Sequence, residues 1–281
     1  MKPLVVIGAA RSGTNLLREL VCQAPGFATW PCDEINLLWR HGNARHPDDE
    51  LSPAQATPEV ARHMRRRFDD IARQSGTANI VEKTCANSLR VAFVDRILPE
   101  ARYLFIMRDG RDAAASAIER FRAPLDWRYT LRKLRFVPAA DLPIYALQFA
   151  RNRASRLLRG DRRLAFWGPR FRGFTEFART ATIAELCARQ WRECVELAAR
   201  DLGAIPDGRV LRLRYEDLVA RPRETLRSVF AFLGVPDAAA AIDVSHVSAA
   251  SVGRGSELLA TGHAGRALEL LEPALARHGY G

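Results

Sequence analysis

A glycine-rich segment near the amino terminus has the spacing of a phosphate-binding loop. Gly8 and Gly13 lie between an apolar run at 4–7, typical of a buried parallel strand, and an amphipathic stretch at 14–23. A loop of this kind turns successive backbone N–H groups towards one point, at the positive end of the dipole of the following helix. The sequence therefore predicts that this loop binds an anion.

The residues within and after this loop differ from those of a P-loop ATPase. Such a loop has Lys at the position of Thr14 and Ser or Thr at the position of Asn15, where they reach the phosphates and Mg²⁺. Here the cation is Arg11, inside the loop, and the hydroxyl that would bind magnesium is missing. A P-loop kinase or related phosphotransferase is therefore an alternative function, but the sequence lacks the residues that such an enzyme has at positions 14 and 15.

A second anion-binding pair is expected beyond the apolar run at 103–107. Arg108 leaves this predicted strand, and Ser116 follows about two turns into the next predicted helix. Both can point at one phosphate, because open α/β sheets bind ligands in the crevice beyond the strand ends. An arginine there makes charge-assisted, often bidentate contacts. The other charged side chains of this turn are expected to pair with each other or with solvent: Asp109, Arg111 and Asp112.

Together these motifs resemble the donor site of sulfotransferases that use PAPS (3′-phosphoadenosine-5′-phosphosulfate). The resemblance implies that the first loop binds the 5′-phosphosulfate through Arg11, Ser12, Gly13, Thr14 and Asn15. It implies that Arg108 and Ser116 bind the 3′-phosphate, and that Arg120 is similar to a further phosphate-facing Arg of tyrosylprotein sulfotransferases. PAPS is then the donor substrate, and PAP (3′-phosphoadenosine-5′-phosphate) the product.

Three further segments match the family in order along the chain. Tyr215 lies in a segment that resembles one whose Tyr contacts the adenine region. Ser251 and Arg254 fall where the family has a loop closing over the 3′-phosphate, although Gly255 stands where Trp or Lys is frequent. The segment 167–170 is similar to one in bacterial members, but its chemistry suggests no role beyond a buried Trp and a turn.

The resemblance also supplies candidates for the chemistry of transfer. The acceptor hydroxyl needs a base, and Asp33-Glu34 resembles the acidic pair of tyrosylprotein sulfotransferases, so Glu34 is the first choice. Asp33 is the second choice, or it caps a helix that starts at 34. Lys83 matches a Lys near the transferring group and would stabilise it beside Arg11, unless it forms an ordinary surface ion pair. None of the six histidines is assigned to catalysis, although His41 and His46 stay possible.

The predicted elements define an α/β fold in which a P-loop-like parallel sheet is flanked by helices. Strands are expected at 4–7, 78–81, 103–107 and 209–214, and helices at 14–23, 88–98, 111–120, 181–202, 222–233 and 265–278. We expect one sulfotransferase domain over 1–281. Residues 121–179 interrupt the alternation as an Arg-rich, aromatic and mostly helical insertion that is expected to cover the acceptor site.

The net charge of +11 is concentrated in the insertion and the turn before it. Residues 120–172 contain fourteen Lys or Arg and three Asp. This excess of positive charge favours the binding of polyanions, or alternatively the stretch forms a solvated helical face. A basic nucleic-acid-binding protein is a second alternative, but the stretch has no zinc-finger, helix-turn-helix or RNA-binding signature, so nucleic acid is not expected. A third alternative is a non-catalytic relative of the family that binds PAP.

Cysteine usage and hydropathy set further expectations. The five cysteines form no C-x-x-C pair, which argues against structural zinc and a disulfide framework, and Cys187 and Cys194 are expected to be buried thiols. No metal is expected at the site. With no transmembrane segment and a poor signal peptide, the protein is expected to be cytoplasmic and bacterial. The acceptor and the oligomeric state stay open, although aromatic residues of the insertion would suit a lipophilic alcohol if they line the mouth.

Overall fold

The computed structural model describes residues 1–122, 138, 141–142, 145, 168–255 and 265–281. Most of the predicted 121–179 insertion therefore lies outside the described residues, and so do six of its aromatic residues: Trp127, Tyr129, Phe136, Phe149, Phe166 and Trp167. Phe171 and Phe174 are described, and they are buried in the main core rather than at the mouth of a site. These two rings therefore give no indication of the acceptor.

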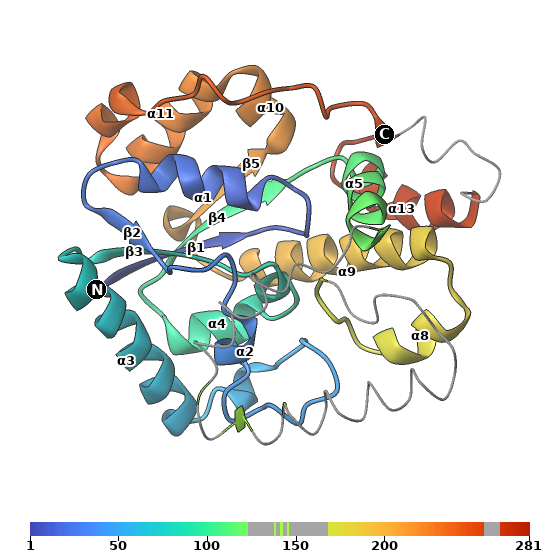
Figure 1. Cartoon of the computed structure of the whole chain (residues 1–281), viewed down its shortest axis with the longest axis horizontal. Coiled ribbons are helices and arrows are strands. Elements are labelled where there is room, and N and C mark those ends of the chain that lie inside the picture. The colour runs from blue at the N-terminus through green and yellow to red at the C-terminus, as the bar shows by residue number, and fades with distance from the viewer. Residues whose placement is uncertain (123–137, 139–140, 143–144, 146–167, 256–264) are drawn as a thin grey trace.

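A five-stranded parallel sheet forms the centre of the molecule (Figure 1). Its strands are β1 (Lys2–Ile7), β2 (Phe27–Thr29), β3 (Asn79–Lys83), β4 (Arg102–Met107) and β5 (Val210–Arg214), in the order β2-β3-β1-β4-β5. The four strands predicted from sequence are all present, and the fold class is confirmed. The edge strand β2 was not predicted, because three residues are too few to show an alternating pattern.

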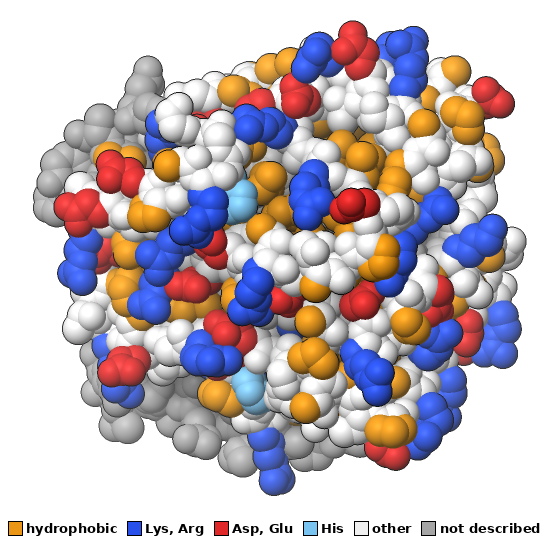
Figure 2. Space-filling view, turned by 180° about the vertical axis from the view of Figure 1, so that it is seen from behind, with side chains coloured by type: hydrophobic (Ala, Val, Ile, Leu, Met, Phe, Trp, Pro, Cys, Tyr) orange, Lys and Arg blue, Asp and Glu red, His pale blue; other side chains and the backbone are white. Residues whose placement is uncertain are grey.

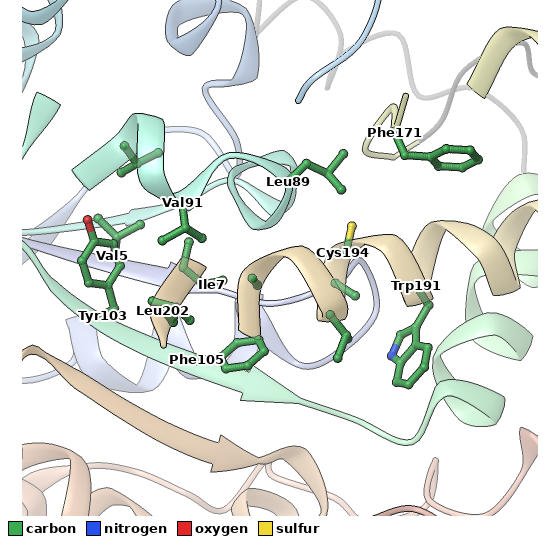
Figure 3. Close-up of a cluster of buried hydrophobic side chains, with 14 of the residues drawn as sticks. Val5, Ile7, Leu89, Val91, Tyr103, Phe105, Phe171, Trp191, Cys194 and Leu202 are labelled. Atoms are coloured by element: carbon green, nitrogen blue, oxygen red, sulfur yellow. The ribbon is translucent and has the colours of Figure 1, made fainter. Parts of the chain in front are cut away.

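Helices cover both faces of this sheet, as parallel strands require. Leu4 and Val6 of β1 face a core shared with α1 (Thr14–Cys22), α10 (Tyr215–Ala220) and α11 (Pro222–Leu233). Val5 and Ile7 face the opposite core (Figure 3). The helices on that side are α3 (Pro58–Ser75), α4 (Val91–Ile97), α5 (Gly110–Arg122), α9 (Ile183–Leu202) and α13 (Gly265–Arg277).

The long helix α9 lies against the sheet and supports the strand ends. Its first turn is fixed by a capping box in which Thr182 accepts from the N–H of Glu185 and the Glu185 side chain accepts from that of Thr182. Trp191 and Cys194 project from α9 into the core, together with Cys187, and both predicted buried thiols are confirmed (Figure 3). The indole of Trp191 donates to the carbonyl of Arg108 at 3.2 Å, so this helix fixes the end of β4.

Two regions differ from the sequence prediction. The expected helix at 88–98 is a 3₁₀ turn at Cys85–Leu89 followed by α4, with Arg90 in a non-helical conformation between them. Arg90 donates to the side chains of Asn87 and Asn36, and these bonds hold the break in place. The region before β3 contains α2 (Asn36–Trp39), where a helix was expected only in the alternative that Asp33 caps it. It also contains α3, which was not predicted, although the spacing of Val60, Met64, Phe68 and Ile71 shows a helical period.

None of the helices in the described ranges combines the length and the apolar character that a membrane span requires.

Candidate active site

A cleft of about 730 Å³ opens at the carboxyl edge of the sheet. The segments that follow β1, β3, β4 and β5 all contribute to its wall, because parallel strands deliver their carboxyl ends to one edge. The predicted site residues on its wall are Arg11, Gly13, Thr14, Asn15, Asp33, Glu34, Lys83, Arg108, Ser116, Arg120, Tyr215 and Ser251. Ser12 and Arg254 are the two predicted site residues absent from this wall.

The first loop is held in a conformation that few side chains tolerate. Arg11 has a φ of 69°, the one positive value among non-glycine residues of the described ranges, and Gly13 has a φ of 83°. A Cβ on Gly13 would lie 2.3 Å from the ring of Tyr215, so the loop needs glycine for space as well as for conformation. Ser12 is fully buried, and its hydroxyl has no hydrogen-bond partner among the described residues. Its backbone N–H donates to the carbonyl of Ala9 at 3.2 Å.

Three arginines lie near one another in the cleft: Arg11, Arg108 and Arg120. The Nε of Arg11 donates to the hydroxyl of Ser116 at 3.0 Å, which links the first loop to α5. Partial burial and the nearby charges of Arg108 and Arg120 lower the pKa of Arg11. Like charges brought this close repel each other, and an anion bound between them would relieve the repulsion.

Arg108 joins the first loop to a segment near the carboxyl terminus. Its guanidinium is almost completely buried and donates to the carbonyls of Arg11 at 3.1 Å and Ser251 at 2.6 Å. It also lies 4.5 Å from the ring centre of Tyr215, whose hydroxyl is 2.9 Å from that of Ser251. The structure thus places Arg108, Tyr215 and Ser251 in one corner of the cleft.

A carboxylate and an ammonium group also line the cleft. Lys83 donates to Oε1 of Glu34 at 3.2 Å, and the backbone N–H of Cys85 donates to the same oxygen at 3.3 Å. Burial has the largest single effect and lowers the pKa of Lys83, but the charge of Glu34, the nearby Cys85 and the hydrogen bond to Glu34 together outweigh it, so that pKa is raised. Lys83 is therefore a cation at neutral pH, and it is too deeply buried to be an ordinary surface pair.

Asp33 also lines the cleft but has a different environment. Its carboxylate pairs with Arg18 at 3.4 Å and is 41% exposed, against 24% for the side chain of Glu34. The alternative in which Asp33 caps a helix that starts at 34 is wrong, because α2 begins at Asn36 and its N-cap residue is Ile35.

A buried network that sequence reasoning missed fixes the segment that contains Glu34. The hydroxyl of Thr84 accepts from the N–H of Ile35 at 3.1 Å and donates to the carboxylate of Glu82 at 2.5 Å. Glu82 is fully buried, and its other oxygen accepts from Asn87 at 2.9 Å. Of residues 82–84, the sequence assigned a role to Lys83 alone, and nothing local in the sequence shows that Thr84 contacts Ile35.

The charged side chains after Arg108 pair only partly as predicted. Arg111 and Asp109 form an ion pair at 2.7 Å, in agreement with the expectation. Asp112 does not pair with either of them or with solvent: it is buried, 3.7 Å from Arg108, and it accepts hydrogen bonds from the backbone of Gly253 and Gly255.

Arg254, by contrast, is an exposed residue of the same segment as these two glycines.

Two residues of the segment 167–170 contribute to the cleft wall, whereas Trp167 lies outside the described residues. Gly168 and Pro169 line the cleft, and the carbonyl of Pro169 accepts from Gln190 of α9 at 2.7 Å. The backbone N–H of Arg170 donates to Asp49, which also accepts from Asn36 in the cleft wall. This segment therefore forms part of the wall beside Glu34.

A second hollow, of about 830 Å³, lies beside α3 and is lined by Met1, Ala78 and several Arg and Asp residues. Met1 and Ala78 precede β1 and β3, so this hollow is at the amino edge of the sheet, away from the strand ends that bind ligands in open α/β folds. No group of three or more His, Cys, Asp or Glu side chains suited to a metal ion occurs within the described ranges.

Comparison with known proteins identifies the family. The Sulfotransferase family profile matches residues 3–160 and 147–239, so the chain belongs to this family of PAPS-binding transferases. Among curated protein sequences, no significant match was found.

Solved structures agree on the fold. The sulfotransferase domain of the Synechococcus PCC 7002 olefin synthase is similar at 17% identity and a TM-score of 0.54, over 97% of this chain and 94% of that one. A sulfotransferase from Mycobacterium tuberculosis is similar at 13% identity and a TM-score of 0.50, over 92% of this chain and 75% of that one. The sulfotransferase domain from the curacin biosynthetic pathway is similar at 14% identity and a TM-score of 0.50, over 84% of this chain and 74% of that one.

Proposed function

We propose that this enzyme transfers the sulfuryl group of PAPS to a hydroxyl group of an acceptor by in-line displacement, with Glu34 as the general base. The observation that carries the proposal is the convergence of four cations and Glu34 on one cleft of a sulfotransferase fold. Arg108 and Arg120 lie near Arg11, and Arg11 also lies near Cys85, whose N–H binds the Glu34 of the Lys83–Glu34 pair. This arrangement suits a donor with phosphates at both ends and an acceptor at the sulfuryl group.

The donor-binding end uses residues from three strand ends. The N–H groups of the first loop and Arg11 would bind the 5′-phosphosulfate at the start of α1. Arg108 and Ser116, with Arg120 nearby, would bind the 3′-phosphate, and Tyr215 would lie against the adenosine. Ser251 would close this corner from the other side.

Transfer then requires one proton to leave the acceptor and one bond to break at sulfur. Glu34 takes the proton from the acceptor hydroxyl, whose oxygen forms the new bond to sulfur. The bond from sulfur to the bridging oxygen breaks, and PAP leaves with the electron pair. Lys83 and Arg11 stabilise the charge that develops on the bridging oxygen and the sulfuryl group, a role that fixed cations can fill without a metal ion.

One face of the molecule gives little support to the nucleic-acid alternative. On the face shown in Figure 2, Lys and Arg side chains alternate with Asp and Glu and form no continuous basic stripe. A protein that follows a phosphate backbone needs such a stripe.

Calorimetric titration with PAP, in EDTA and in Mg²⁺, tests the donor site. Wild-type protein should bind PAP equally in both, and Arg108→Ala should lose most of the affinity. Arg111→Ala is the matched control, because it removes the same charge next to the cleft from a residue that pairs with Asp109. Absence of PAP binding, or ATP binding that requires Mg²⁺, would contradict the proposal and favour a phosphotransferase.

A further inference from the structure

Asp112 holds the segment 251–255 against the first turn of α5. Its Oδ2 accepts from the N–H of Gly253 at 2.8 Å and its Oδ1 from the N–H of Gly255 at 2.6 Å, so one carboxylate binds two backbone donors of a segment 141 and 143 residues away. The side chain of Asp112 is 3% exposed. Hydrogen bonds to a buried charge are among the stronger ones in proteins, and an unpaired carboxylate at this position would be costly.

The backbone of this segment fits against α5 only because Gly255 has no side chain. A Cβ at Gly255 would lie 2.2 Å from the carbonyl carbon of Arg111 and 2.4 Å from the backbone nitrogen of Asp112. Neither atom can move without disturbing the helix. Gly255, which stands where the family frequently has Trp or Lys, therefore allows the direct contact between this segment and α5.

This contact fixes the corner of the cleft that contains Arg108. Ser251 precedes the two glycines, its carbonyl accepts from Arg108, and its hydroxyl contacts that of Tyr215. Asp112 lies one helical turn after Arg108, with 3.7 Å between the two charged groups. Asp112 is thus close enough to act in either of two ways: as a counter-ion for Arg108 or as the attachment point of the segment.

We propose that Asp112 is a positioning residue for the donor nucleotide, whose carboxylate seats residues 251–255 and thereby places Ser251 beside Arg108 where the 3′-phosphate binds. The proposal rests on the proposed function, because it names the part of that donor site that closes on the 3′-phosphate. It assigns to Asp112 no direct contact with the nucleotide.

The variant Asp112→Asn separates the two possible roles by the sign of its effect. It removes a negative charge 3.7 Å from Arg108, so a simple counter-ion role predicts that PAP binds more tightly or equally. The positioning role predicts weaker binding, because an amide NH₂ group would face one of the two glycine N–H groups and the segment would be released. We expect about tenfold weaker binding of PAP, the size of one charge-assisted hydrogen bond.

A second nucleotide shows whether the effect concerns the 3′-phosphate. Adenosine 5′-phosphate lacks that group, so its affinity should change less than about twofold in Asp112→Asn, and the ratio of the two affinities should fall about tenfold. Asp109→Asn is the control, since it makes the same charge change in the same turn at a residue that pairs with Arg111. Both nucleotides should bind this control as they bind the wild type.

A variant that keeps the carboxylate provides an independent test. Gly255→Ala should lift the segment from α5 and weaken PAP binding selectively, even if Asp112→Asn does not fold. Hydrogen exchange at Gly253 and Gly255 should be slow in the wild type and fast in both variants. Wild-type PAP affinity in either folded variant would overturn the positioning role, whereas a wild type that does not bind PAP would contradict the proposed function and, with it, the role of Asp112.

Discussion

The ammonium group of Lys83 lies 3.2 Å from the carboxylate of Glu34, although the two residues are 49 positions apart in the sequence. The N–H of Cys85 binds the same carboxylate oxygen. A base held by one cation and one backbone donor has a fixed orientation towards the cleft, and the cation stays in position to stabilise the transferring group. This pair is the basis of two predictions.

Replacing Glu34 by Gln should lower turnover about 10²–10⁴-fold, the usual contribution of a positioned base, and leave PAP affinity nearly unchanged. Turnover can be followed as PAP release with an acceptor found by screening alcohols and phenols. Asp33→Asn is the matched control, and it should lower turnover far less because Asp33 pairs with Arg18 and is more exposed. Equal losses in the two variants would show that Glu34 is not the base.

Replacing Lys83 by Met should lower kcat about 10²-fold, the effect of removing one electrostatic contact from a buried site. Without the ammonium group, the carboxylate of Glu34 should bind a proton at higher pH, so the acid limb of the pH–rate profile should move upwards. Lys83→Arg, which keeps the charge, should preserve the position of that limb. An unchanged limb in Lys83→Met would contradict the coupling of the two residues.

Replacing Thr84 by Val should lower both stability and turnover. The N–H of Ile35 and the buried carboxylate of Glu82 each lose a partner, which costs about 1–3 kcal/mol of unfolding free energy. Turnover should fall because Glu34 precedes Ile35, while PAP affinity should hold. Thr84→Ser keeps the hydroxyl and should have nearly wild-type unfolding free energy and turnover, as measured by denaturation and by activity. Normal turnover in Thr84→Val would show that Thr84 does not position Glu34.

The thiol of Cys85 should react slowly with alkylating reagents at pH 8. Burial and the charge of Glu34 raise its pKa to about 12, so the reactive thiolate is scarce and its fraction grows as pH rises towards that value. Removing the charge in Glu34→Gln should lower that pKa and speed alkylation at a given pH. Peptide mapping by mass spectrometry measures the rate, with urea-denatured protein as the reference for a free thiol. Fast alkylation of the native wild type would contradict the buried, protonated state.

Much of the proposed donor site was predictable because its signals are local. Gly8–Gly13 lies directly between a strand and a helix, and Arg108 and Ser116 lie within one strand–helix turn. Such a unit has a similar local geometry in any parallel sheet, so its spacing places these side chains near the strand ends, and the family resemblance supplied their expected roles. The strands at 4–7 and 103–107 were equally clear, because they are buried on both faces and apolar throughout.

The sequence by itself thus determined the fold class, the family resemblance and many of the polar residues on the cleft wall. Only the tertiary structure showed that Thr84 binds Ile35, and that Asp112 binds Gly253 and Gly255 rather than its sequence neighbours. These contacts join segments 49 to 143 residues apart. No local period or motif encodes such pairings, because they exist only once the parallel sheet has gathered its strand ends at one edge.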